Sequence, residues 1–410
     1  MAYQVKTTKN YGNRLLDSLK GAGKGFILFG IGTILLFVNE GNYVKNAKTI
    51  GSAEKAVVRV SDISEVKPAL DGKLIHAYGF ADTQDTLTDD QFGVSERAIA
   101  LSRKVEFYQY RENKQTEKKD KMGGGEETTT TYTYDKIWVS SPISSDGFAD
   151  PDYKGKNFVL DNLDTKVKSQ TLYASNVTFG AYKLPSFIIK SIRGSAPVEI
   201  RTGSEELMGK LGLKIGNQVQ IQGNMVYFGK ASSTPQIGDV RITIAKTVPA
   251  DISIIARVIG STFEEYLAPG TGRTFTAVEM GTVGPEAMFA GAKQANSFFT
   301  WLLRIIGILL VVISLKMVFA ILPTLFKVLP PLAKIVGAGV GLVCAIGGGA
   351  WSLIIIAIAW LFYRPLIGIP MLLVAIAGIW FLSKKAKEKK AAGATAGKSD
   401  ATADNGDIAK

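Results

Sequence analysis

The distribution of apolar residues constrains this chain more than any other feature of its sequence. One apolar run lies near the N-terminus, at residues 21–40, and three lie near the C-terminus, at residues 298–321, 335–362 and 365–382. A helix of roughly 20 apolar residues spans the hydrocarbon core of a bilayer. The sequence therefore predicts an α+β membrane protein with four transmembrane helices and a large folded domain between the first and the second.

The first run is short for a membrane span. Its core, residues 25–38, is completed by flanking small residues and by Lys24, whose aliphatic stem can extend to the interface. A cleaved signal peptide is the alternative interpretation. No small-residue cleavage site follows, because the next residues are Asn39, Glu40 and Gly41. We therefore expect an uncleaved membrane anchor.

The net charge of +12 is concentrated beside the apolar runs. Residues 1–24 carry five basic side chains and one acidic one, and residues 297–410 carry twelve basic and four acidic ones. Residues 25–296 have no net charge, because they carry 31 basic and 31 acidic side chains. A nucleic-acid-binding protein would carry the excess on its folded domain, whereas a membrane protein carries it on the cytoplasmic flanks of its spans. The pattern argues against a nucleic-acid partner.

The basic flanks also predict a topology. Four spans place both termini on one side, and both termini are basic, as is the loop that contains Lys327 and Lys334. By the positive-inside rule this side is the cytoplasm. We therefore expect residues 1–20 and a basic, disordered tail at 383–410 in the cytoplasm, and residues 41–284 outside it. That location is the periplasmic side of the inner membrane in a bacterium, or the lumen of the endoplasmic reticulum or nuclear envelope in a eukaryote.

The external domain has the pattern of β-structure. Apolar and polar residues alternate at residues 99–107 and, after a charged, Gly-rich stretch, again at residues 128–140. Two alternating runs around such a turn predict a long β-hairpin. The charged stretch, residues 112–127, has the composition of a solvated tip, and a surface for a partner is the other interpretation.

The two halves of this domain share a pattern. In each, a strand and a glycine are followed by a loop and a long alternating strand, within residues 50–178 and 195–284. One interpretation is a pair of OB-like units. The other is chance, because any antiparallel domain yields such pairs, and the sequence leaves both open.

The residues before the second span predict a helix. Pro285 and Glu286 suit its first turn, and apolar residues recur on one face through residues 285–297. Nothing interrupts the pattern before residue 298, so we expect this amphipathic linker to continue into the span.

The chain lacks the sequence signals of an enzyme. His76, the only histidine, lies in a predicted strand, where a structural role is expected, and Cys344, the only cysteine, lies in an apolar run. The zinc-protease, redox and nucleophile-elbow motifs are absent. Residues 393–399 imitate a phosphate-binding loop but have one residue too few between their glycines. We expect no enzymatic activity, no cofactor and no metal site.

Three charged residues stand at the membrane ends of the runs. Glu40 follows the first, Arg304 lies inside the second, and Arg364 lies in the turn between the last two. A charged side chain in a membrane is costly unless it is paired or faces a polar cavity. One hypothesis is an interhelical cluster in which Glu40 neutralises Arg304 or Arg364 and joins the first span to the C-terminal ones. The alternative is that each residue contacts lipid headgroups alone.

The third span is rich in small residues. They are Gly337, Gly341, Gly347, Gly348 and Gly349. Small residues let helices approach closely, which predicts a face for helix packing or self-association. A helix broken at the triple glycine, as in a channel or transporter, is the alternative, but the paired repeat typical of such folds is absent.

Short residue runs, spread over residues 25–382, follow the order of a known membrane-protein family. They are residues 39–41 (NEG), 72–79 (GKLIHAYG), 103–110 (RKVEFYQY), Tyr132, Tyr134 and Trp138, residues 238–242 (GDVRI), 300–304 (TWLLR) and 360–365 (WLFYRP). In this order, and with four spans, the chain resembles the transmembrane protein 43 family, also called LUMA. One departure is that residues 154–158 (KGKNF) stand where the family usually has a His-x-Asn-Pro element.

This resemblance implies a non-enzymatic organiser of membranes. Animal members are similar scaffold-like proteins of the endoplasmic reticulum and inner nuclear membrane, which bind lamina-associated proteins and each other. We therefore expect a membrane scaffold that self-associates and presents its external domain to membrane lipids and unidentified protein partners. The alternative is a channel or transporter with a regulatory external domain. The lone histidine, the lack of disulfides and the simple tail suggest a bacterial member.

Overall fold

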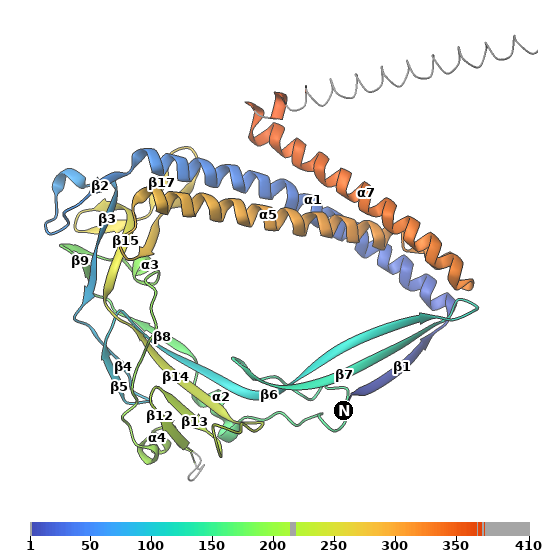
Figure 1. The fold of residues 1–410 in the computed structure, drawn as a ribbon, viewed down its shortest axis with the longest axis horizontal. Coiled ribbons are helices and arrows are strands. Elements are labelled where there is room, and N and C mark those ends of the chain that lie inside the picture. The colour runs from blue at the N-terminus through green and yellow to red at the C-terminus, as the bar shows by residue number, and fades with distance from the viewer. Residues whose placement is uncertain (1, 214–218, 367, 371–372, 374–410) are drawn as a thin grey trace, which may run out of the picture. The chain divides into compact units, whose positions relative to one another are not determined.

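The computed structural model describes residues 2–213, 219–366, 368–370 and 373 (Figure 1). The chain divides into two compact units. Unit 1 comprises Met1–Asp17, Lys45–Asn296 and Pro323–Val336, and unit 2 comprises Ser18–Val44, Ser297–Leu322 and Gly337–Lys410. Unit 1 holds the strands, and the described part of unit 2 consists of long helical segments.

Three helices are long and apolar enough to cross a membrane. They are α1 (Tyr11–Ala56), α5 (Pro285–Val318, whose apolar stretch continues through residue 328) and α7 (Pro330–Tyr363). Between 17% and 22% of the residues in their apolar windows are buried inside the protein, so most of these side chains are available to lipid. The fourth predicted span, residues 365–382, and the predicted tail, residues 383–410, lie mostly or wholly outside the described residues.

The helices extend beyond the predicted spans because nothing stops them at the membrane boundary. Asn10 caps α1 by accepting a 2.8 Å hydrogen bond from the backbone N–H of Asn13, and the helix ends where Val57 becomes extended. α5 runs without a break through the predicted linker, residues 285–297, and the predicted second span. The turn between α5 and α7 contains the short α6 (Ile321–Leu325) and the 3-10 turn η3 (Phe326–Val328).

Unit 1 is built on two larger antiparallel sheets. The first has the order β1 (Tyr3–Lys9), β7 (Glu126–Val139), β6 (Ala100–Asp120), β14 (Val240–Thr247), β13 (Met225–Phe228) and β12 (Val219–Gln222), with β8 (Gln170–Tyr173) on β6 and β11 (Ala196–Pro197) on β14. The second has the order β10 (Tyr182–Lys183), β9 (Val177–Phe179), β3 (Leu74–Thr83), β15 (Ala250–Ile259) and β16 (Thr262–Glu264), with β19 (Ala277–Met280) on β15 and β2 (Val58–Val60), which is parallel, on β3.

Short elements complete unit 1. They are the hairpins β4 (Thr86–Asp89) with β5 (Val94–Arg97) and β17 (Tyr266–Ala268) with β18 (Arg273–Phe275), the helices α2 (Leu163–Lys166), α3 (Ser186–Ile189) and α4 (Ser204–Leu211), and the 3-10 turns η1 (Pro68–Leu70) and η2 (Leu160–Asn162). Each larger sheet has its own apolar core. Val105 and Ile242 are buried in the first, and Ile75 and Ile254 in the second.

The predicted long hairpin is confirmed. β6 and β7 pair in continuous register from Phe107 opposite Val139 to Asp120 opposite Glu126. The alternation of apolar and polar residues that predicted it corresponds to the buried face of β6, where Val105 and Phe107 are covered.

The two predicted units, residues 50–178 and 195–284, do not form separate barrels. β6 from the first half pairs with β14 from the second, and β3 from the first half pairs with β15 from the second. Both sheets therefore mix the two halves, and the OB-like interpretation at these boundaries is wrong. The shared pattern reflects antiparallel pairing in general, which was the alternative.

The N-terminal residues form a strand that no sequence pattern predicted. β1 pairs with β7 from Tyr3 opposite Tyr132 to Lys9 opposite Glu126. Residues 111–121 of the adjoining β6 hairpin carry no apolar side chain, and such a segment does not cross hydrocarbon. This pairing is at odds with the expectation that residues 1–20 and 41–284 lie on opposite sides of a membrane.

Candidate functional site

The carboxylate of Glu40 in α1 joins three helices of unit 2. Arg304 in α5 donates to it from Nε, at 2.5 Å to Oε1, and from Nη2, at 2.7 Å to Oε2. Trp360 in α7 donates from Nε1 to Oε2 at 2.8 Å. The three donors surround a carboxylate that is 1% exposed. This arrangement can hold α1, α5 and α7 together at one level.

The guanidinium of Arg304 is enclosed as well as paired. Its central carbon lies 4.7 Å from the centre of the Trp301 ring and 5.8 Å from that of Trp360. Aromatic faces stabilise a cation at these distances. Directly before Glu40, the side-chain amide of Asn39 donates to the backbone carbonyl of Thr300, one turn before Arg304, at 3.0 Å. This bond adds a second polar contact between α1 and α5.

Arg364 lies near this pair but does not share its carboxylate. Its guanidinium carbon lies 4.5 Å from the centre of the Tyr43 ring, a cation–π contact. Arg304 and Arg364 line the same pocket of about 200 Å³. The other lining residues are Tyr43, Ser297, Thr300, Trp301 and Trp360.

The structure therefore pairs Glu40 with Arg304 and places Arg364 beside them, on an aromatic ring. The cost of a charge in a membrane predicted these three charged residues but not the aromatic residues around them. These aromatic residues could have been found from their positions, because Tyr43, Trp301 and Trp360 lie near the ends of apolar runs. Aromatic residues gather at such positions in membrane proteins.

The five glycines predicted to pack helices are not equivalent. A Cβ atom on Gly348 would lie 2.9 Å from Val312 Cγ2 and 3.1 Å from Val312 Cα, so this glycine lets α7 approach α5. A Cβ atom on Gly341, Gly347 or Gly349 would meet no other described atom within 4 Å. Gly337 is half-buried. α7 continues as helix through the triple glycine, so the structure has no helix break there.

Two glycines outside the small-residue pattern of α7 bring α1 against α5. A Cβ atom on Gly32 would lie 3.0 Å from Val311 Cγ2, and one on Gly307 would lie 2.6 Å from Leu36 Cδ2. Leu36 and Val311 are fully buried between the helices. Small residues at the contact allow this close approach.

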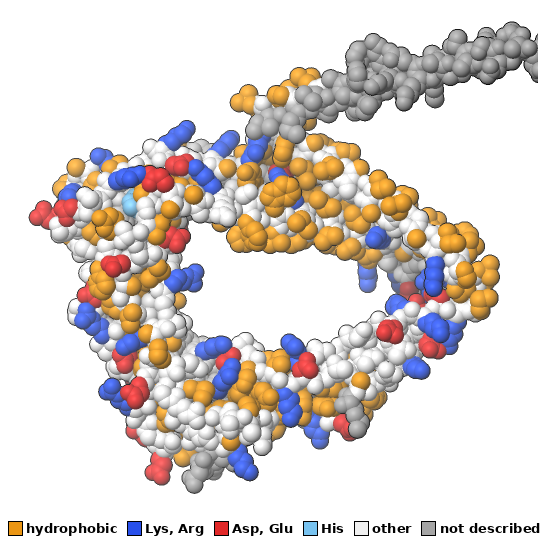
Figure 2. Space-filling model, in the orientation of Figure 1, with side chains coloured by type: hydrophobic (Ala, Val, Ile, Leu, Met, Phe, Trp, Pro, Cys, Tyr) orange, Lys and Arg blue, Asp and Glu red, His pale blue; other side chains and the backbone are white. Residues whose placement is uncertain are grey.

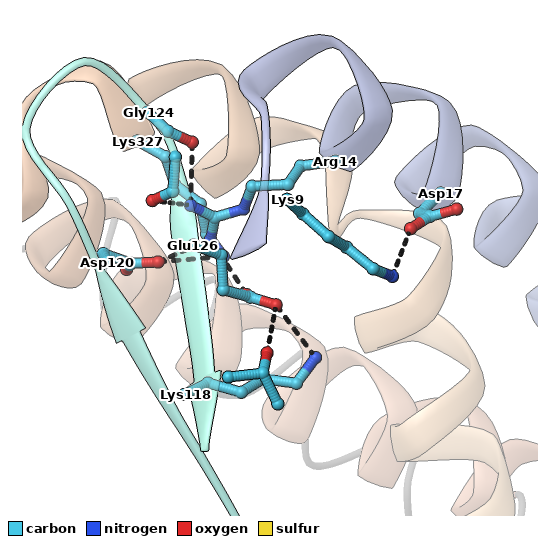
Figure 3. A network of polar contacts seen from close by, with 10 residues as sticks. Lys9, Arg14, Asp17, Lys118, Asp120, Gly124, Glu126 and Lys327 are labelled. Carbon is cyan, nitrogen blue, oxygen red and sulfur yellow. Dashed lines mark hydrogen bonds and ion pairs between the residues drawn. The ribbon is translucent and has the colours of Figure 1, made fainter. Parts of the chain in front are cut away.

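A second polar cluster, within unit 1, fixes the tip of the β6–β7 hairpin (Figure 3). Arg14 donates to the carbonyls of Gly124 and Gly125, both at 2.9 Å, and to Asp120 at 2.5 Å. Its guanidinium also lies 3.2 Å from Glu126. The side chain of Arg14 is 4% exposed, so the tip encloses it.

The turn between α5 and α7 closes the same cluster. Nζ of Lys327 lies 3.6 Å from Asp120, and the backbone N–H of Gly123 donates to the carbonyl of Val328 at 3.2 Å. Burial alone would raise the pKa of Asp120, but the hydrogen bond from Arg14 and the positive charges of Lys327 and Arg14 outweigh it and lower that pKa. The charged stretch at residues 112–127 thus contacts other segments of its own chain.

His76, the only histidine of the sequence, has a polar partner in the structure. His76 is buried, and its Nε2 lies 2.8 Å from the carbonyl of Val283. Within the part of the chain that the structure describes, no group of three His, Cys, Asp or Glu residues is placed to hold a metal ion. The candidate site is therefore the cluster of Glu40, Arg304, Trp360 and Arg364 with its pocket.

Comparison with known proteins gives matches over most of the chain. The model of a family described as "Transmembrane protein 43" matches residues 107–365. "Transmembrane protein 43" of Rattus norvegicus is 27% identical over 363 residues, which cover 86% of this chain and 87% of the relative. The Homo sapiens protein of that name is 26% identical over 375 residues, covering 88% and 90%. The "Transmembrane protein 43 homolog" of Drosophila melanogaster is 24% identical over 367 residues, covering 87% and 93%. No solved structure matches the chain.

Proposed function

This chain belongs to the transmembrane protein 43 family, and on that basis we propose that it is a non-enzymatic membrane scaffold, which self-associates and presents its β-rich unit 1 to lipid and protein partners. It is an integral membrane protein, with three apolar helices among its described residues. Hydrophobic side chains gather over these helices in the space-filling view (Figure 2). Side chains such as Phe26, Ile27 and Val343 are more than 60% exposed, which suits contact with acyl chains.

Open glycine positions on α7 are the observation that supports self-association. Gly341, Gly347 and Gly349 have no described atom in the space that a Cβ atom would fill, whereas Gly348 already packs on α5. Helices associate in lipid through close backbone approach, because the hydrophobic effect does not drive helices together there. At 100° per residue, Gly347 and Gly349 lie on opposite sides of α7. A second copy of α7 supplies a helix that fits either side.

Two observations bear on which face of the membrane carries unit 1. The basic flanks of the spans favour an extracytoplasmic location under the positive-inside rule. The pairing of β1 with β7 favours a single face for residues 3–9 and the β-rich unit. A cross-link between these strands in membranes distinguishes the two arrangements.

The kind of membrane is a further part of the proposal. The relatives are animal proteins, so they give no support to the bacterial inner membrane that composition suggested. A eukaryotic membrane, such as the endoplasmic reticulum or nuclear envelope, is consistent with them.

The mass of the purified full chain in detergent, measured by native mass spectrometry, tests the scaffold proposal. We expect an assembly of more than one copy. Isoleucine at Gly347 or at Gly349 fills one open side of α7 at a time, and at least one of these two variants should shift the mass toward the monomer. A wild-type chain that is monomeric at all concentrations contradicts self-association. Ion conductance in a planar bilayer would instead favour the channel alternative.

A further inference from the structure

The pocket in unit 2 has a net positive charge among its described neighbours. Arg304 and Arg364 each contribute one positive charge, and Glu40, which is paired with Arg304, contributes one negative charge. Glu40 accepts from two of the five N–H groups of Arg304, which leaves three for other acceptors. Arg364 rests on an aromatic face rather than on a carboxylate among the residues described. The pocket therefore suits a ligand with one negative charge.

The other lining groups suit an oxyanion. Tyr43, Ser297 and Thr300, which carry hydroxyl groups, line the same pocket as the two arginines. Guanidinium groups bind the acceptor oxygens of a phosphate through paired hydrogen bonds, so the two arginines alone give the pocket the donors that such a group needs. The volume, about 200 Å³, exceeds that of a few water molecules, since each water occupies about 30 Å³ of the liquid.

The pocket lies at the level where the apolar runs end. Tyr43 comes after the first run, Ser297 comes directly before the second, and Arg364 directly follows α7. Trp301 is 59% exposed at this level. Tryptophan and tyrosine gather at the depth of lipid headgroups. A phosphate group reaches such a pocket from the headgroup layer.

We propose that this pocket binds a phosphate group, with Arg364 and the outward N–H groups of Arg304 as its ligands. The proposal rests on the membrane location within the proposed function and adds the ligand class to it. At this depth the source is the phosphodiester of a phospholipid headgroup; free inorganic phosphate is the other source of the same chemistry. Glu40 holds Arg304 in place and limits the pocket to a singly charged group.

Native mass spectrometry of the full chain in detergent tests the proposal. The protein is exposed to phosphatidylglycerol, to diacylglycerol, which lacks the phosphate, or to inorganic phosphate. We expect retention of phosphatidylglycerol and at least a tenfold smaller retention of diacylglycerol. Arg364→Gln should reduce retention of phosphatidylglycerol about tenfold. Lys316→Gln removes an exposed charge from α5 outside the pocket and should leave it unchanged.

The outcomes separate the sources of phosphate and the two proposals. Binding of inorganic phosphate that depends on Arg364, without phospholipid binding, supports the phosphate site and assigns it to a soluble ligand. Equal retention of both lipids, or equal retention by wild type and Arg364→Gln, overturns the proposal. Arg364→Lys, which keeps the charge but loses the planar fork, should give an intermediate loss. The assembly mass of Arg364→Gln should match wild type, so a failed phosphate site leaves the scaffold proposal standing.

Discussion

Glu40 and Arg304 form a bidentate ion pair between α1 and α5, with oxygen–nitrogen distances of 2.5 and 2.7 Å. Both side chains are nearly excluded from solvent, at 1% and 11% exposure. A buried pair of this kind adds little stability over an apolar contact, but losing one partner leaves an uncompensated buried charge. The pair therefore fixes the position of the helices more than it stabilises them.

Glu40→Gln should destabilise the protein strongly. The amide cannot neutralise Arg304, and breaking a buried pair costs about 3–5 kcal/mol. Thermal unfolding of the purified protein in detergent, followed by tryptophan fluorescence, measures the loss. The matched control is Glu54→Gln, which removes an exposed pair with Lys293 and should cost at most about 1 kcal/mol. Equal unfolding temperatures for the two variants would contradict a structural role for the Glu40–Arg304 pair.

Neighbouring glycines of α7 should respond differently to the same substitution. Gly348→Ala places a methyl group 3.1 Å from Val312 Cα, so the helices must separate, and overpacking of this kind costs about 1–3 kcal/mol. Gly347→Ala meets no described atom and should be neutral or stabilising by up to about 1 kcal/mol, because alanine favours helix over glycine. Unfolding temperatures of the two variants give the comparison. A similar loss in both would mean that α7 does not pack on α5 through Gly348.

The sequence predicted the features that follow from local periodicity or from the free-energy cost of placing a charge in a membrane. Apolar length predicted the helices, a period of two predicted the β6–β7 hairpin, and the cost of a charge near lipid led to Glu40 and Arg304. The partners of these features were not predictable in the same way. Pairing of β3 with β15 joins residues far apart in sequence, and no local pattern specifies it.

Other parts of the site depended on the packing of the helices. Five glycines on α7 look alike in sequence, yet Gly348 alone among those with described Cβ surroundings meets α5. Trp360 reaches Glu40 because α7 packs beside α1, which hydropathy does not reveal. β1 is short and polar, so its strand character comes from the free edge of β7 rather than from its own sequence.

The hairpin tip should loosen in acid. The pKa of Asp120 is lowered in the folded protein, so its contribution to stability is present above the ordinary carboxyl pKa of about 4 and is lost as the pH falls through the lower folded value. The groups that face it are Arg14 and Lys327, and Glu126 shares Arg14 with it. Amide hydrogen exchange of residues 118–126, corrected for the intrinsic effect of pH, should show less protection at low pH.

Asp120→Asn provides the control for that experiment. The variant should have weaker protection at neutral pH, because Arg14 loses a charged acceptor, and a smaller change on acidification. Lys118 also contacts Glu126, at 3.4 Å, so part of the pH response can remain. An unchanged pH profile in Asp120→Asn would assign the response to groups other than Asp120.

A disulfide between β1 and β7 should form in the membrane-bound protein. Thr7 lies opposite Thr128 in the antiparallel register, and directly opposed residues in such a pair have Cα atoms about 4.5–5.5 Å apart, within the range of a disulfide. With Cys344 replaced by serine, Thr7→Cys with Thr128→Cys should cross-link under mild oxidant. Thr7→Cys with Thr133→Cys, five residues out of register, should not. Cross-linking of the first pair places residues 3–9 and the hairpin on one face of the membrane, and rules out the arrangement in which α1 separates them. The opposite outcome has two parts: neither pair forms a disulfide, and impermeant maleimide labels the two cysteines of the first pair from opposite sides of sealed vesicles. In that case β1 does not pair with β7 and the positive-inside topology stands.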